Sequence, residues 1–318
     1  MSRAHDVAVA VGFRAGWRLL RVLPEAVVLA GAERVADRLH RQDGPRVQQL
    51  RATLRRARPH ASPAELETVV RDGLASYARY WCETFRLPSF SRERIVATVT
   101  TSGVEPVRAA LAEGRGVVLA LGHLGNWDHA GAWATLELAP VVTVAERLRP
   151  AAVYDAFLAF RASLGMTVLP LGEPATSATL VRSLRAGALV PLLADRDLTG
   201  HGVPVRFLGE ELRMAAGPAT LALATGAALF TTAVTSVPLP AGHPARRTGA
   251  RYGLHLAVGP RLPVPTAVRG AERTAAVVEL TQALADGLAS AVAAHPQDWH
   301  VLQPVFAADV EAARQDAP

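Results

Sequence analysis

His123 and Asp128, with four residues between them, are the side chains best equipped for chemistry in this sequence. The apolar run 117–121 predicts a buried strand, so that the imidazole lies on the loop at the carboxyl end of that strand. Open α/β sheets bind their ligands at this edge. An imidazole oriented by a carboxylate can take the proton of an alcohol, and the spacing therefore predicts a general base. The same residues also fit a structural turn histidine and an acid that complements the dipole of the next helix.

Two further polar groups follow predicted strands. Asp195-Arg196-Asp197 ends one strand, Glu146-Arg147-Leu148-Arg149 ends another, and Arg161 lies on the helix that follows. Such charges are costly to bury without a partner, and arginine suits a carboxylate, a phosphate or a sugar. Each group alone is equally typical of a surface ion pair. Their recurrence at strand ends favours a polar ligand site.

The sequence lacks the residues that several kinds of catalytic and metal-binding chemistry require. The 34 cations of the chain are all arginine, which excludes a P-loop lysine and a Schiff-base lysine. The single cysteine, Cys82, excludes a disulfide frame and favours a reducing compartment, and the N-terminus shows no secretory signal pattern. No Gly-x-Ser-x-Gly elbow occurs. His129 stands beside Asp128, but no matching His or Glu cluster occurs elsewhere, so we expect no metal site.

The elements that must position these residues alternate between strands and helices. The 318 residues are 50% apolar, enough for a sizeable core. This alternation predicts an α/β fold with a central, mostly parallel mixed sheet flanked by helices. We expect strands at 117–121, 141–145, 167–171, 189–194, 228–237 and 252–258, and helices at 127–138, 151–164, 175–185 and 274–294. The uncharged stretch 214–242 contains Gly and Pro breaks, and it predicts a helix and a buried strand rather than a membrane span.

The N-terminal region differs in composition from the rest. Residues 1–60 carry a net charge of +7, whereas the remainder carries −1. We expect residues 1–87 to form a basic helical region that associates with a membrane, and residues 88–318 to form the α/β core, the two best treated as one domain. No nucleic-acid module is visible, so an anionic membrane surface is the favoured partner and nucleic acid is not expected.

The first predicted helix supports that interpretation. Phe13, Trp17 and Leu20 recur at helical spacing, and Arg14, Arg18 and Arg21 form a neighbouring face. Apolar anchors flanked by arginines are typical of a helix that lies in the headgroup layer of a bilayer. The alternative is an ordinary surface helix that packs Phe13 and Trp17 against the core. Charges and Pro24 interrupt the run well before a transmembrane length.

Taken together, the motifs resemble those of the lysophospholipid acyltransferase superfamily, whose first motif is His-x4-Asp/Glu. The chain is most similar to the lipid A lauroyl/myristoyl acyltransferase-like branch and, within it, to the actinobacterial acyltransferases of phosphatidylinositol mannosides. The resemblance covers about residues 75–240. It rests on the segments 80–86, 122–133, 160–165, 193–198, 201–209 and 217–226. Most members of the lipid A branch have Glu where this chain has Asp128, which shortens the reach toward His123 and is compatible with other acceptors.

The resemblance implies transfer of an acyl chain, typically palmitoyl, from acyl-CoA to the mannose 6-hydroxyl of a mannosylated phosphatidylinositol. His123 would be the general base and Asp128 its orienting partner, while Glu146, Arg161 and Asp195-Arg196-Asp197 would shape the polar site. No cofactor, metal or covalent acyl-enzyme is implied, and acyl-CoA is a co-substrate. The expected location is peripheral, on the cytoplasmic face of the cell membrane. Alternatives are another glycolipid or lysophospholipid acceptor, a non-enzymatic lipid-binding protein, and a hydrolase that releases fatty acid.

Overall fold

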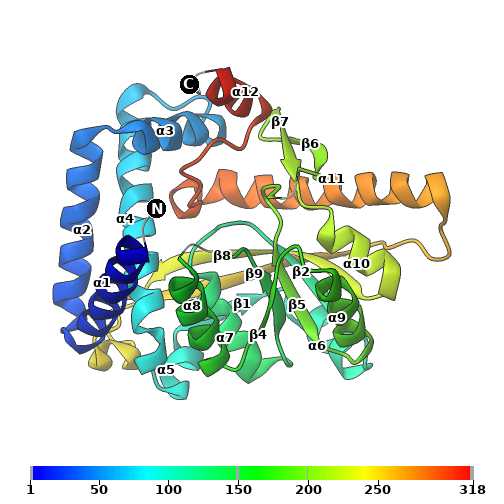
Figure 1. The fold of residues 1–318 in the computed structure, drawn as a ribbon, viewed down its shortest axis with the longest axis horizontal. Helices are drawn as coiled ribbons and strands as arrows, with labels where there is room; N and C mark the ends of the chain where they lie inside the picture. The colour runs from blue at the N-terminus through cyan, green and yellow to red at the C-terminus, as the bar shows by residue number, and fades with distance from the viewer. Residues whose placement is uncertain (1–2, 148–149, 199, 316–318) are drawn as a thin grey trace.

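The predicted α/β architecture is confirmed by the computed structural model, which describes residues 3–147, 150–198 and 200–315 (Figure 1). Leu148 and Arg149 of the polar group after the second predicted strand lie outside the described residues. A five-stranded sheet has the order β1-β9-β8-β2-β5, and its pairs are parallel except for β8–β9. Its strands are β1 (Val99–Ser102), β2 (Val117–Leu121), β5 (Leu189–Leu193), β8 (Ala228–Pro238) and β9 (Tyr252–Leu262).

A two-stranded parallel sheet continues beyond β5. It pairs β3 (Val142–Ala145) with β4 (Thr167–Pro170), and a single bridge from Val141 to Leu189 links it to the central sheet. The crossover helices are α7 (Trp127–Glu137), α8 (Ala151–Ser163) and α9 (Pro174–Arg185). All six predicted strands and all four predicted helices of the core are therefore confirmed, with ends that differ by a few residues.

The alternation of side chains along β2 sets the two layers of the core. Val118 and Ala120 face one cluster, which contains α10 (Gly217–Thr225) and α11 (Gly270–Ala294). Val117, Leu119 and Leu121 face the opposite cluster, which contains α7 and α8. All five residues of β2 are buried, because helices cover both faces of the strand.

Other elements were not predicted. They are β6 (Val203–Phe207), β7 (Glu210–Met214), α5 (Arg92–Ala97), α6 (Glu105–Ala112), α12 (Ala307–Gln315) and the short 3-10 turns Leu87–Ser89, Pro244–Thr248 and Pro296–Asp298. The hairpin β6–β7 alternates buried and exposed residues over only five positions in each strand. β1, which was not predicted either, is a four-residue strand with one apolar residue, Val99, so its sequence carries little periodic signal.

The N-terminal region is helical, as predicted. It contains α1 (Arg3–Val22), α2 (Glu25–Gln42), α3 (Pro45–Ala57) and α4 (Pro63–Arg86). α4 begins at a complete capping box, in which the Ser62 side chain accepts from the Glu65 backbone and the Glu65 carboxylate accepts from the Ser62 backbone. The helix then runs beside the sheet, where its Tyr80 and Glu83 hydrogen-bond to Asp128 and Asn126 at the start of α7.

The expected orientation of α1 requires a correction. Phe13 and Trp17, predicted as membrane anchors, pack inward against Phe85 and Phe157, and the indole N–H of Trp17 donates to the backbone oxygen of Phe85 at 2.7 Å. Burying two aromatic rings in the core is more favourable than the shallow insertion that the periodicity suggested. The exposed residues of α1 include Arg18, Leu19, Arg21 and Val22.

One helix among the described residues, α11, is long and apolar enough to cross a membrane by length and composition. Its Leu280, Leu284, Leu288 and Val292 are buried in the core cluster with β2 and β5. α11 therefore packs as a core helix along one side of the sheet (Figure 1). The uncharged stretch 214–242 forms α10 and β8, as predicted.

Candidate active site

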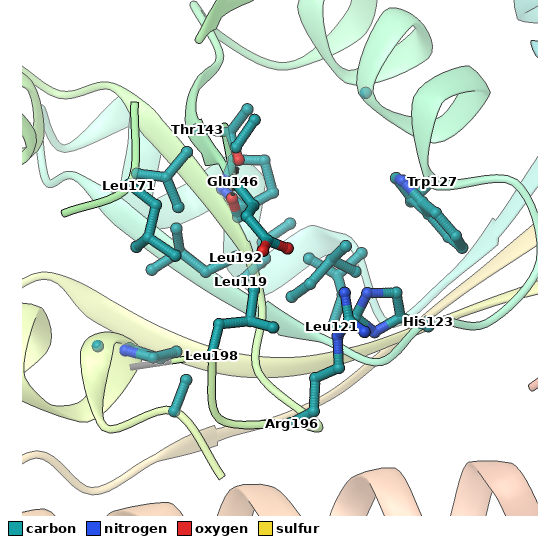
Figure 2. A pocket seen from close by; sticks show the side chains of 18 of the residues that line it. Leu119, Leu121, His123, Trp127, Thr143, Glu146, Leu171, Leu192, Arg196 and Leu198 are labelled. Carbon is teal, nitrogen blue, oxygen red and sulfur yellow. Dashed lines mark hydrogen bonds between the residues drawn. The ribbon is translucent and has the colours of Figure 1, made fainter. Parts of the chain in front are cut away.

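A cavity of about 1290 Å³ opens at the carboxyl ends of β2, β3 and β5. Figure 2 shows His123, Trp127, Glu146 and Arg196 among its lining side chains, together with leucines from the strands. The lining of the cavity has a large apolar part and a smaller polar part, which suits a ligand with an aliphatic chain and a polar group. The leucines and aromatic residues of the apolar part include Leu119, Leu121, Phe157, Leu158, Leu171, Leu180 and Leu192.

His123 lies on the loop after β2 and is paired with Asp195, which follows the neighbouring strand β5. The ring Nδ1 is 2.6 Å from Asp195 Oδ1, and the backbone N–H of His123 donates to Asp195 Oδ2 at 2.8 Å. Because a carboxylate only accepts hydrogen bonds, Nδ1 carries the proton in the neutral ring and Nε2 is the basic atom. Among the described residues, no hydrogen-bond partner occupies Nε2. The geometry is that of a general base with its orienting acid.

The expected pairing of the His123 imidazole with the Asp128 carboxylate is wrong, because the two side chains have other partners in the structure. Asp128 lies in the first turn of α7 and is buried, and its two oxygens bond to Arg161 Nε at 2.7 Å and to the hydroxyl of Tyr80 at 3.1 Å. The helix directs the Asp128 carboxylate toward α8 and α4, so it cannot serve the imidazole at the end of β2. Asp128 and Arg161 instead form a buried ion pair beside the cavity, and this pair raises the pKa of Arg161 although burial alone would lower it.

Asp195 is fully buried and still ionised. Burial alone would raise its pKa, but the positive character and hydrogen bonds of His123, together with the indole N–H of Trp299, hold it below its ordinary value. The Trp299 indole donates to Asp195 Oδ2 at 2.8 Å, and Trp299 is itself fully buried. Three donors therefore fix both carboxylate oxygens, which leaves the imidazole one orientation.

The segment Asp298-Trp299-His300 supports the same loop through its backbone. The N–H of His300 donates to the His123 oxygen at 2.8 Å, and the N–H of Gly125 donates to the Asp298 oxygen at 2.9 Å. Ser76 of α4 hydrogen-bonds to the Asp298 carboxylate. Burial lowers the pKa of the His300 ring to about 3, so it stays neutral at the base of the cavity. This segment was missed by the sequence reasoning, since it lies outside the strand–helix alternation and carries no spacing signal.

The remaining predicted site residues line the cavity, and one of them also holds a loop in place through a hydrogen bond. Glu146 and Arg196 line the cavity, and Arg196 Nε is buried with no hydrogen-bond partner among the described residues. Asp197 also lines the cavity, and its carboxylate accepts the backbone N–H of Gly202 at 2.6 Å. The structure thus brings His123, Arg161 and Asp195-Arg196-Asp197 to one end of the sheet, with Glu146 on the adjoining wall.

The loop after His123 leads directly into a helix N-terminus. Asn126 caps α7 by accepting the backbone N–H of His129, and its amide donates to Glu83. The first N–H groups of the helix, at Trp127 and Asp128, have no carbonyl partner one turn earlier. They lie beside the histidine and can stabilise negative charge.

His129 belongs to the structural core and not to the cavity. Its ring contacts the Thr98 hydroxyl, and burial lowers its pKa to about 4. Within the residues that the structure describes, no group of three His, Cys, Asp or Glu side chains could hold a metal ion.

Comparisons with known proteins converge on lipid acyltransferases. The pattern of bacterial lipid A biosynthesis acyltransferases matches residues 7–307. The chain is 41% identical to the phosphatidylinositol mannoside acyltransferase of Mycolicibacterium smegmatis, over 96% of this chain and 93% of that protein. It is 40% identical to the phosphatidylinositol mannoside acyltransferase of Mycobacterium tuberculosis, over 95% of this chain and 90% of that protein.

Proposed function

This chain belongs to the bacterial lipid A biosynthesis acyltransferase family, and from that premise we propose that it acylates a phosphatidylinositol mannoside. In the proposed reaction, an acyl chain, palmitoyl in the simplest case, moves from acyl-CoA to the 6-hydroxyl of a mannose. The observation that carries the proposal is the His123–Asp195 pair, whose imidazole lines a large and mostly apolar cavity.

The proposed chemistry needs one proton acceptor at the sugar. His123 Nε2 takes the hydroxyl proton while the sugar oxygen attacks the thioester carbonyl, and the tetrahedral intermediate then expels the CoA thiolate. His123 returns the proton to that sulfur, so the imidazole ends neutral. A general base contributes about 10²–10⁴-fold to such a step. Because the thioester is already activated, the proposal requires no metal, cofactor or covalent acyl-enzyme.

The remaining acceleration comes from positioning and charge. In the proposed reaction, the N–H groups of Trp127 and Asp128 at the start of α7 stabilise the negative charge that develops on the carbonyl oxygen. Arg161 and Arg196 place positive charge in the polar part of the lining, which suits the phosphates of acyl-CoA or of the acceptor headgroup. Glu146 can accept hydrogen bonds from sugar hydroxyls. The apolar part of the cavity holds the acyl chain.

The test is mass spectrometry of the products after incubation with palmitoyl-CoA and purified phosphatidylinositol mannoside. A product heavier by one palmitoyl group, with the acyl position mapped to the mannose 6-hydroxyl, is the expected result. Parallel reactions with other glycolipids and with lysophospholipids separate the alternative acceptors. Loss of acyl-CoA without acceptor would identify a hydrolase, and no loss with any acceptor would leave a lipid-binding protein.

We also propose that the enzyme works peripherally at the cytoplasmic face of the cell membrane. The large hydrophobic residues exposed on α1 and α2 support this location; they are Leu19, Val22, Val27, Val35 and Leu39. The basic side chains beside them supply attraction to anionic lipids. The membrane contact is thus made by this face of α1 and α2 and not by Phe13 and Trp17, which are turned inward.

Replacing Arg14, Arg18 and Arg21 together by glutamine is expected to weaken binding to anionic vesicles about 10²-fold, since each basic side chain near the surface contributes about 1 kcal/mol. Vesicle co-sedimentation measures the change. The matched control replaces Arg108, Arg115 and Arg182, which are exposed elsewhere, and should retain binding. Equal binding by the two variants would exclude this face. Raising the salt concentration should weaken binding of the unchanged protein.

A further inference from the structure

A second, smaller cavity lies on the far side of α7 and α8 from His123. Its volume is about 840 Å³, within the range of small-molecule sites. The two cavities share no lining residue, because α7 presents Ala130, Gly131 and Ala134 to the catalytic cavity and Ala132, Thr135 and Leu136 to the second one. A molecule in the second cavity therefore cannot reach the base.

The wall of this groove is apolar. It is formed by α1, the segment that follows α4, and the outer faces of α7 and α8. Trp17, Leu87, Phe90, Ile95, Leu136, Phe160 and Leu164 contribute most of the surface. Leu136, Leu164 and Phe90 are only partly buried, so apolar area remains open to a ligand.

The charges around the groove have a single sign. Arg18 and Arg21 from α1 and Arg92 at the start of α5 line it, and no acidic residue of the described part of the chain does. None of the three arginines forms an ion pair with a carboxylate of the described residues. Arg21 Nε donates to the Phe85 oxygen at 3.1 Å, which holds its guanidinium at the groove. Three arginines next to an apolar wall are complementary to an anion with an aliphatic chain.

We propose that this groove binds an anionic phospholipid that is not a substrate, with one acyl chain along α7 and α8 and its phosphate among Arg18, Arg21 and Arg92. The groove adjoins the exposed face of α1, where Leu19 and Val22 extend outward, so a bilayer lipid can enter it without leaving the membrane. Bound there, the lipid joins α1 to α8 and holds the enzyme at a fixed orientation on the surface. The site depends on membrane binding but not on the transfer chemistry.

The experiment uses the full-length protein on phosphatidylcholine vesicles that contain phosphatidylglycerol with a photoreactive diazirine in its acyl chain. Peptide mass spectrometry then locates the crosslinks. We expect them on groove residues of α7 and α8, such as Leu136 and Ala159. Crosslinks confined to the outer faces of α1 and α2, or equal yields from a zwitterionic phosphatidylcholine probe, would overturn the proposal.

Two variants sharpen the result without touching the active site. Ala159→Trp fills the groove from α8, whereas Ala162→Trp places the same ring on an exposed position of that helix outside both cavities. Only the first should abolish the α7–α8 crosslinks. Arg92→Gln should raise the half-saturating phosphatidylglycerol fraction about three- to tenfold, since one arginine near an anionic lipid surface contributes about 1 kcal/mol. Arg182→Gln is its control. Because crosslinking is read without turnover, failure here leaves the acyl transfer proposal untouched.

Discussion

Replacing His123 by alanine is expected to lower kcat for acyl transfer by about 10³-fold or more, while the protein stays folded. The imidazole lines the cavity and is held by a buried carboxylate, and general base catalysis alone is worth about 10²–10⁴-fold. Initial rates of glycolipid acylation with palmitoyl-CoA measure the loss. KM for acyl-CoA should change little, because the side chain acts in the transition state.

The matched control is His60→Ala, which removes an exposed imidazole from the turn before α4. It should keep full activity. Circular dichroism and thermal unfolding of both variants check the fold, since His123→Ala also leaves Asp195 with one donor fewer. Retained turnover in a folded His123→Ala protein would eliminate this base and, with it, the proposed mechanism.

The second prediction with a large effect distinguishes the role of the Asp195 carboxylate from that of the Asp128 carboxylate. Asp195→Asn is expected to lower kcat by about 10²–10⁴-fold, because an amide cannot hold the imidazole in the Nδ1-protonated form that leaves Nε2 basic. Asp195 does not contact the substrate, so it is a positioning residue, and KM should stay close to that of the unchanged enzyme. The kcat and KM values from initial rates distinguish this role from impaired substrate binding.

Asp128→Asn is the informative counterpart. It removes the charge that pairs with the buried Arg161, and breaking a buried pair costs up to about 3–5 kcal/mol of the free energy of unfolding. We therefore expect a lowered Tm and a kcat that falls far less than in Asp195→Asn. The reverse pattern, with activity lost only in Asp128→Asn, would restore the pairing that the His-x4-Asp spacing predicts. Each outcome assigns the acid to one residue.

The comparison of these two aspartates shows where local spacing ceases to be informative. Sequence places Asp128 one helical turn after His123, close enough to suggest a pair. The structure turns that carboxylate toward Tyr80 and Arg161, because the first turn of α7 fixes the direction of its side chain. Asp195 is 72 residues away, and β2 and β5 bring it to the histidine because they are neighbouring parallel strands.

Local composition was sufficient wherever one face of an element is buried. The apolar runs of β2 and β5 and the breaks within 214–242 each determined an element, because strand burial and Gly or Pro geometry act within a few residues. The same runs placed His123 and Asp195 at carboxyl strand ends. The sequence by itself thus determined the fold class and the strands that carry the candidate site.

Tertiary structure alone decided which groups meet. The pairing of His123 with Asp195, the Trp299 donor behind it and the inward packing of Phe13 and Trp17 all join segments distant in the chain. Such contacts depend on the order of the strands in the sheet and on which face of each helix packs against the core. The local sequence periodicity of the residues involved does not reveal either of them. The free energy of burying an aromatic ring or fixing a carboxylate is gained only when the whole core assembles.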